Sequence, residues 1–161
     1  MTFRICFVCL GNICRSPMAE VVMRQQLRDA RLDGRIEVGS AGTGDWHVGE
    51  MADPRTVEAL GRHGYDGSQH RARQFARDMF DDSDLVVAMD ANNLAALSRV
   101  APPGRADDVV LLRSFDPDAD GTDVPDPYYG GPDGFDHALA MVESACRGLL
   151  GWLQDEILAT S

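Results

Sequence analysis

FRICFVCLGNICRSP, residues 3–17, decides the fold of this chain. The apolar run from Arg4 to Val8 predicts a short buried strand. The residues from Pro17 to Leu32 predict an amphipathic helix whose apolar face carries Ala19, Val22, Met23, Leu27 and Ala30. Ser16 is expected as the N-cap of this helix, with Pro17 at the first helical position. CLGNICRSP (9–17) therefore forms a turn that leaves a strand and enters a helix.

The same alternation of strand and helix continues along the chain. Three further strands are predicted at residues 35–38, 84–89 and 108–112. Three further helices are predicted from Asp53-Pro54 to just before Gly64, from about Asp90 towards Arg99, and after Gly134 along a stripe that reaches Ile157. This order is typical of a doubly wound, flavodoxin-like α/β fold, with a parallel four-stranded sheet and helices on both faces. Residues 113–134 are expected as the one long irregular segment.

Length and charge limit the classes of protein. With 161 residues, of which 44% are hydrophobic, the chain is expected to form one domain over residues 1–161. A net charge of −11 disfavours nucleic acid and anionic membrane surfaces as partners. No apolar run approaches the ~20 residues that span a bilayer, and the N-terminus lacks a cleavage site, so we expect a cytoplasmic protein. The sequence does not decide the oligomeric state, and we expect a monomer.

Metal and cofactor motifs are incomplete. Cys6 and Cys9 form a C-x-x-C pair without the second pair of a zinc site, and we expect all four cysteines to be reduced thiols. Residues 116–121, DPDADG, begin like a calcium loop, but Pro127 stands where a bidentate Glu is required. Residues 42–47, GTGDWH, begin like a dinucleotide fingerprint, but His47 replaces its third Gly. We therefore predict no metal and no cofactor.

The turn itself favours binding of a phosphate group. The N–H groups at a helix N-terminus are unpaired, and the helix dipole favours negative charge there. Cys9 and Arg15 bracket five residues, which can curl around a tetrahedral oxyanion while the guanidinium closes the ring. Gly11 permits a tight bend, and Asn12 tolerates a left-handed conformation. Either Cys9 or Arg15 alone would be interpreted as a structural residue; together, at this turn, they predict a nucleophile inside a phosphate cradle.

At these residues the chain resembles a known family. VCLGNICRSPMAE (8–20) is similar to the phosphate loop of the low-molecular-weight protein tyrosine phosphatases, and DPYYGG (126–131) to their acid loop. Similarity also covers residues 40–55, 69–75 and 86–94, so it spans essentially the whole chain. C-x5-R alone is shared by several groups of phosphatases. The loop near the N-terminus combined with a distant Asp-Pro-Tyr-Tyr is far more specific.

The resemblance implies a protein tyrosine phosphatase that needs no metal. In that family the cysteine, here Cys9, attacks phosphorus in line, and water hydrolyses the resulting phosphocysteine. Arg15 and the loop amides would stabilise the transition state, and Asp126 would protonate the leaving phenolate. The implied substrates are tyrosine-phosphorylated proteins and small aryl phosphates.

The resemblance also implies roles for further residues. The remaining positions of the phosphate loop are Leu10, Gly11, Asn12, Ile13, Cys14 and Ser16. Ser40 and His70 match a network that supports this loop. The walls of the substrate cleft match Trp46, His47, Tyr128 and Tyr129; the family often has Asn at position 47, so His47 is a departure that bears on specificity. Cys14 matches a loop cysteine that can trap oxidised Cys9 as a disulfide, and its alternative role is packing beneath the loop.

Two other functions compete with a phosphatase. A thiol-dependent arsenate reductase shares this loop and fold, but it needs a further pair of cysteines, and only Cys146 follows Cys14. A non-catalytic phosphotyrosine-binding or redox-sensing module would not need an acid such as Asp126. Both are disfavoured.

Overall fold

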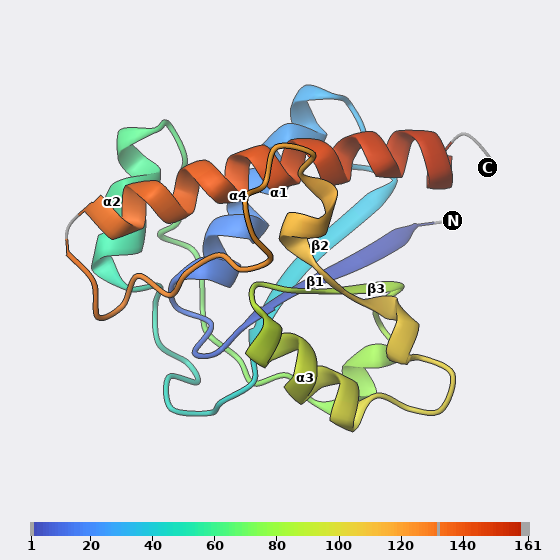
Figure 1. The fold of residues 1–161 in the computed structure, drawn as a ribbon. Helices are drawn as coiled ribbons and strands as arrows, with labels where there is room; N and C mark the ends of the chain where they lie inside the picture. The colour runs from blue at the N-terminus through green and yellow to red at the C-terminus, as the bar shows by residue number, and fades with distance from the viewer. Residues whose placement is uncertain (1, 132, 159–161) are drawn as a thin grey trace.

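The computed structural model describes residues 2–131 and 133–158 and contains one parallel sheet (Figure 1). Its strands are β1 (Phe3–Cys9), β2 (Ile36–Gly42), β3 (Leu85–Ala88) and β4 (Val109–Leu111). They lie in the order β2-β1-β3-β4. The predicted four-stranded parallel sheet is thus confirmed.

Helices cover both faces of this sheet. The four α-helices are α1 (Arg15–Asp29), α2 (Pro54–Arg62), α3 (Ala91–Val100) and α4 (Asp133–Trp152), and α4 continues into a π-helical turn, η4 (Leu153–Ile157). Alternate residues of β1 point to opposite faces, as the pleat of a strand requires. Phe7 packs in the larger hydrophobic cluster with side chains of α1 and α4, and Val8 packs in the smaller one with Leu97 of α3. Figure 1 shows α1, α2 and α4 on one side of the sheet and α3 on the other.

β2 is longer than the predicted strand 35–38. It continues through Gly39, Ser40, Ala41 and Gly42, which pair in register with Cys6 to Cys9 of β1. These small residues have weak strand propensity, but their pairing with the buried strand β1 outweighs this preference. On the open edge of β2, Arg24 Nη2 donates to Val38 O at 2.7 Å and Arg73 Nε donates to Ser40 O at 2.8 Å. The Gly42 N–H donates to Arg73 O, and Gly42 O accepts from the Phe75 N–H.

The start of α1 corrects the expected capping. The helix begins at Arg15, Cys14 is its cap residue, and no side chain in the described part of the chain caps it. The hydroxyl of Ser16 is instead engaged with Cys9 and Asn12, so it is not available as an N-cap. The helix also ends at Asp29 rather than Leu32, since Arg31 adopts a left-handed φ of 61°.

The other predicted helices are confirmed with small shifts. Asp53 caps α2 by accepting a hydrogen bond from the Arg55 N–H, with Pro54 at the first position, and Asp90 caps α3 through the Asn93 N–H. Cys146 is fully buried on α4, as expected. Short 3-10 turns at Arg77–Phe80, Ala106–Asp108 and Leu112–Phe115 were not predicted. The last of these shortens the irregular segment to residues 116–131, after which α4 begins.

Three chemical features of the fold bear on function. Cys6, Cys9, Cys14 and Cys146 are all free thiols. Over residues 2–131 and 133–158, no three or more His, Cys, Asp or Glu side chains are grouped as metal ligands would be. In the same described part of the chain, none of the helices has the length and apolar character needed to cross a bilayer.

The topology places a crevice at the end of β1. The chain leaves β1 towards β2 on one side and later returns to β3 on the other. In open parallel sheets, ligands bind beyond the carboxyl ends of the strands where the order reverses in this way. Cys9 is the last residue of β1 and lies at that point.

Candidate active site

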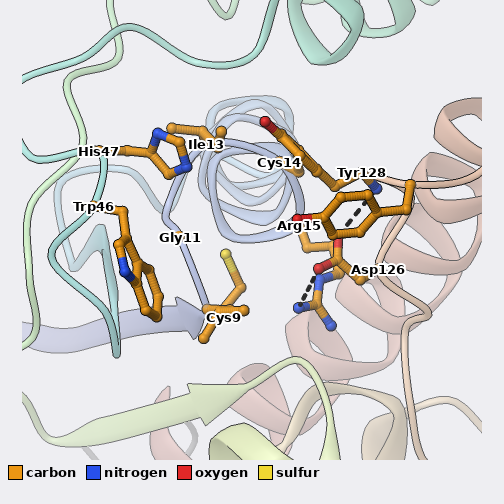
Figure 2. Close-up of a pocket in the computed structure, with 11 residues that line it drawn as sticks. Cys9, Gly11, Ile13, Cys14, Arg15, Trp46, His47, Asp126 and Tyr128 are labelled. Carbon is orange, nitrogen blue, oxygen red and sulfur yellow. Dashed lines mark hydrogen bonds and ion pairs between the residues drawn. The ribbon is translucent and has the colours of Figure 1, made fainter.

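A cleft of about 280 Å³ opens beyond the carboxyl end of β1 (Figure 2). All the residues that line it were predicted as site residues. They are Cys9, Leu10, Gly11, Ile13, Cys14, Arg15, Trp46, His47, Asp126, Tyr128 and Tyr129. Of the other predicted residues, Asn12 and Ser16 belong to the loop itself, and Ser40 and His70 contact it from behind; Asn12, Ser16 and Ser40 are buried.

The thiol of Cys9 receives hydrogen bonds from its own loop. The Asn12 N–H points at Cys9 Sγ across 3.3 Å, and Ser16 Oγ lies 3.0 Å from the same sulfur. Ser16 Oγ accepts a hydrogen bond from Asn12 Nδ2 at 2.8 Å, so the hydroxyl proton of Ser16 can be donated to Cys9. Donors aimed at sulfur stabilise the thiolate, which is the nucleophilic form of cysteine.

The side chain of Asn12 connects the loop to β2 and α1. Its second amide hydrogen is donated to Ser40 Oγ at 3.0 Å, and Ser40 Oγ donates in turn to Glu20 Oε1 at 2.7 Å. Asn12 Oδ1 accepts the Arg73 N–H at 2.9 Å. Every polar atom of this buried side chain is therefore used, which fixes where the loop stands relative to β2.

The backbone of Asn12 is held as well. Its φ of 58° is left-handed, a conformation that Asn tolerates better than most residues. His70 Nε2 donates to Asn12 O at 2.6 Å. Burial lowers the pKa of His70, although this hydrogen bond opposes the shift, so His70 supports the loop as a neutral ring.

Arg15 is buried and anchored through one of its nitrogens. Nη1 donates to Asp90 Oδ2 at 2.7 Å and to Val124 O at 2.9 Å. Burial opposes the charge, but the negative charges of Cys9 and of the two nearby carboxylates, Asp90 and Asp126, outweigh it and raise the pKa of Arg15. Nε is buried and has no hydrogen-bond partner among the described residues. The edge formed by Nε and Nη2 therefore keeps two donors in a fixed orientation.

Asp126 reaches the cleft from the segment before α4. Its Oδ2 lies 3.7 Å from Arg15 Nη2, and its Oδ1 accepts the Tyr128 N–H at 3.1 Å. The side chain is 37% exposed, so it faces both the cleft and solvent. The structure thus brings Cys9, Arg15 and Asp126 together from distant parts of the sequence.

Aromatic side chains form two walls above Cys9. Figure 2 shows Trp46 and His47 on one side of the cleft and Tyr128, with Asp126, on the other. The rings of Tyr128 and Tyr129 meet edge to face with centroids 4.8 Å apart, and Tyr129 itself is 92% exposed. His47 Nδ1 contacts Glu50 Oε2, and a Cβ at Gly11 would lie only 3.1 Å from the His47 ring. His47 therefore packs directly on the phosphate loop.

Comparison with known proteins identifies the family. The family model described as "Low molecular weight phosphotyrosine protein phosphatase" matches residues 4–159. The chain belongs to this family. This confirms the predicted family, and with it the prediction of a hydrolase that acts as a protein-tyrosine phosphatase.

Individual relatives agree with the family match. A low molecular weight protein-tyrosine-phosphatase of Streptomyces coelicolor is 57% identical over 160 residues, which cover 98% of this chain and 97% of the relative. The crystal structure of YfkJ from Bacillus subtilis matches with a TM-score of 0.92 and 38% identity, covering 98% of each chain. A structure of the arginine phosphatase YwlE, a mutant with a phosphorylated active-site serine, matches with a TM-score of 0.85 and 29% identity, covering 97% of this chain and 99% of that one.

Cys14 differs from Cys9 within this phosphatase loop. Burial, together with the negative charge of Asp53, raises the pKa of the Cys14 thiol to about 12. Cys14 is therefore a neutral thiol near neutral pH.

Sequence analysis missed two residues that hold the phosphatase site in place. Asp90 follows β3 at the same edge of the sheet as Cys9, and its carboxylate both caps α3 and binds Arg15. Glu20 lies one helical turn beyond Ser16 on α1 and accepts the hydrogen bond from Ser40. The position of Asp90 at a strand end was a usable indication, whereas Glu20 resembled any helix carboxylate until Ser40 was placed beside it.

Proposed function

We propose that this phosphatase hydrolyses phosphotyrosine in proteins, and small aryl phosphates, through a phosphocysteine on Cys9. The observation that carries the proposal is the convergence of Cys9, Arg15 and Asp126 on one cleft with aromatic walls. The Cys9 sulfur, with the Asn12 N–H and the Ser16 hydroxyl beside it, lies at the floor of this cleft and is placed to attack phosphorus in line with the leaving oxygen. The related mutant whose active-site serine is phosphorylated supports a covalent intermediate at the nucleophile position.

Charge stabilisation falls to Arg15 and the loop amides. The transferred phosphoryl group carries its charge on three equatorial oxygens. The Nε–Nη2 edge of Arg15 offers two parallel donors to two of them, while Nη1 stays on Asp90. N–H groups at the start of α1 contribute the rest, with the helix dipole favouring the same negative charge. This arrangement supplies the electrostatic stabilisation without a metal ion.

Asp126 acts as the general acid and then as the base. Because Oδ1 accepts the Tyr128 N–H, Oδ2 is the oxygen that carries the proton, and it passes this proton to the phenolate as the P–O bond breaks. The carboxylate left behind takes a proton from the water that attacks the phosphocysteine. That step releases inorganic phosphate and regenerates the Cys9 thiolate.

The aromatic walls favour a phenyl ring. Trp46 on one side and Tyr128 on the other form a slot that suits phosphotyrosine and places a shorter phosphoserine too far from Cys9. An arginine phosphatase has the same fold at 29% identity, and the names of relatives at 57% and 46% identity support tyrosine as the phosphorylated residue. The partners are therefore tyrosine-phosphorylated proteins. The cytoplasmic location and the monomeric state expected from the sequence stay predictions.

Hydrolysis of an aryl phosphate with a chelator present tests this function. The parent protein should turn over, and acid quenching during turnover should recover protein that carries a phosphoryl group. Cys9→Ser should lose turnover, because a serine hydroxyl is a far weaker nucleophile than a thiolate, and any phosphoryl group found on it should remain on the serine instead of turning over, as in the related mutant. Cys6→Ala, on the opposite face of β1, is the matched control and should retain turnover. Absence of turnover in the parent, or turnover that survives Cys9→Ser, would refute the proposal.

A further inference from the structure

Arg55 lies behind the acid loop, outside the residues that line the cleft. It is the second residue of α2, and its side chain is 45% exposed. Its guanidinium carbon is 5.1 Å from the centre of the Tyr128 ring and 4.7 Å from that of Phe135 on α4. The side chain thus contacts α4 and the segment that carries Asp126.

One residue joins Arg55 to the carboxylate of Asp126. Arg55 Nη1 donates to Tyr128 O at 3.0 Å, and the N–H of the same Tyr128 donates to Asp126 Oδ1 at 3.1 Å. Displacement of Tyr128 would therefore displace Asp126. The hydrogen bond to Tyr128 O restrains both.

The other side of Arg55 is fixed to the phosphate loop. Nε donates to Asp53 Oδ1 at 3.0 Å and Nη2 donates to Asp53 Oδ2 at 2.9 Å, a two-point contact that defines the plane of the guanidinium. The N–H of Asp53 donates to Ile13 O at 2.9 Å. A continuous set of hydrogen bonds therefore runs from the phosphate loop, through Asp53, Arg55 and Tyr128, to Asp126.

We propose that Arg55 is a positioning residue for the general acid, setting the distance between Asp126 and the phosphate loop. The inference rests on the proposed role of Asp126 as the acid. Arg55 makes none of the hydrogen bonds around Cys9 or Arg15, so its loss leaves nucleophile and phosphate binding in place. What changes is the fraction of molecules in which Asp126 Oδ2 reaches the leaving oxygen.

A pair of substrates separates this role from a general effect on folding. Phenyl phosphate needs a proton on its leaving oxygen, whereas 2,4-dinitrophenyl phosphate releases an acidic phenol and needs none. Arg55→Gln should lower kcat/KM for phenyl phosphate by about tenfold. This is part of the contribution of a general acid, which is about 10²- to 10⁴-fold in rate. The kcat/KM for 2,4-dinitrophenyl phosphate should change less than twofold. Inhibition by inorganic phosphate should be unchanged.

Two further variants complete the test. Arg62→Gln is the matched control: Arg62 lies on the same helix with 44% exposure and pairs with Glu58 and Asp136, so it should affect neither substrate. Arg55→Lys keeps the charge but cannot bind Asp53 and Tyr128 O together in a fixed plane, so it should show a smaller loss with the same substrate preference. If Arg55→Gln fails to fold, Arg55→Lys decides the question by this preference.

A double variant ties the effect to Asp126. Asp126→Asn should slow the hydrolysis of phenyl phosphate strongly and that of dinitrophenyl phosphate little. Adding Arg55→Gln to this variant should slow the hydrolysis of phenyl phosphate no further. Equal slowing of both substrates by Asp126→Asn would refute the acid itself. If Asp126→Asn behaves as expected but Arg55→Gln behaves like Arg62→Gln, or slows both substrates equally, only the role of Arg55 is refuted.

Discussion

At the scale of single residues, two cysteines five positions apart illustrate how environment divides chemical roles. Cys9 ends a strand, the Asn12 N–H donates to its sulfur, and the Ser16 hydroxyl lies 3.0 Å from the same sulfur. Cys14 stands just before α1, is buried, and has a pKa of about 12 because burial and the charge of Asp53 disfavour its thiolate. We propose that Cys14 reacts only after Cys9 has been oxidised.

The balanced chemistry of that protection predicts its pH dependence. Peroxide converts the Cys9 thiolate to a sulfenic acid, and the Cys14 thiolate attacks that sulfur, expelling hydroxide and forming a disulfide. Since the pKa of Cys14 is raised to about 12, its thiolate fraction grows with pH throughout the range below that value. Disulfide closure should accelerate about 100-fold from about pH 7 to about pH 9, measured by mass spectrometry after a peroxide pulse.

Recovery of activity tests the same role. After peroxide treatment, a thiol reductant should restore the parent and Cys6→Ala, while Cys14→Ser should stay largely inactive as its Cys9 oxidises further. Equal recovery of Cys14→Ser and the parent would leave Cys14 as a packing residue.

At the scale of elements, the phosphate loop stands where it does because β2 ends in small residues. A Cβ on Gly42 would lie 2.8 Å from Leu10 O and 3.0 Å from the Asn12 N atom, both backbone atoms of the loop. Sequence analysis ended this strand at Val38, since propensity favours Val over Gly, Ser and Ala. It also misplaced the start of α1, because Ser16 serves Cys9 and not the helix end. Both errors lie beside the site, where the demands of the loop override local preference.

Gly42→Ala should therefore displace the loop while leaving the fold intact. We expect kcat/KM for an aryl phosphate to fall about 100-fold, since misplacement of reacting groups by about 1 Å has effects of that size. Gly39→Ala on the same strand is the control. Its Cβ would meet Arg73 Nη2 at 3.0 Å, the end of a flexible side chain. Equal activity of the two variants would contradict this account of β2.

At the scale of the whole molecule, the parallel four-stranded sheet was predictable because the hydrophobic pattern alternates between strand and helix, whereas the order of its strands comes from the structure. The lining of the cleft was predictable because motif residues mark it. Among the supporting residues, Ser40 and His70 were named through the family resemblance, and Asp90 was indicated by its place at a strand end. Arg55 and Glu20 gain their roles only when distant segments meet. The sequence also did not predict the contact of α4 with the 3-10 turn at Leu112–Phe115. This turn precedes the segment that carries Asp126.

Gly148 makes that approach possible and gives a test of stability. A Cβ there would lie 1.9 Å from Phe115 O, so Gly148→Ala must push the helix and the turn apart. We expect a loss of about 1–3 kcal/mol in the free energy of unfolding, measured by urea denaturation. Gly151→Ala lies three residues further along α4, and no atom of the described residues is within 4 Å of its added Cβ, so it should instead gain about 0.5–1 kcal/mol from helix propensity. A stable Gly148→Ala would show that the contact is not tight.

Arg24 and Arg73, on the open edge of β2, also bear on contacts between molecules, because they occupy backbone carbonyls that another chain could pair with. An edge strand with bare carbonyls invites strand addition by another chain and, at high concentration, fibril growth. Here the outward carbonyls of Val38 and Ser40 already accept from Arg24 and Arg73, and Gly42 is paired with residues 73 and 75. The opposite edge, β4, is only three residues long. We therefore expect neither edge of the described sheet to serve readily as a template for another chain.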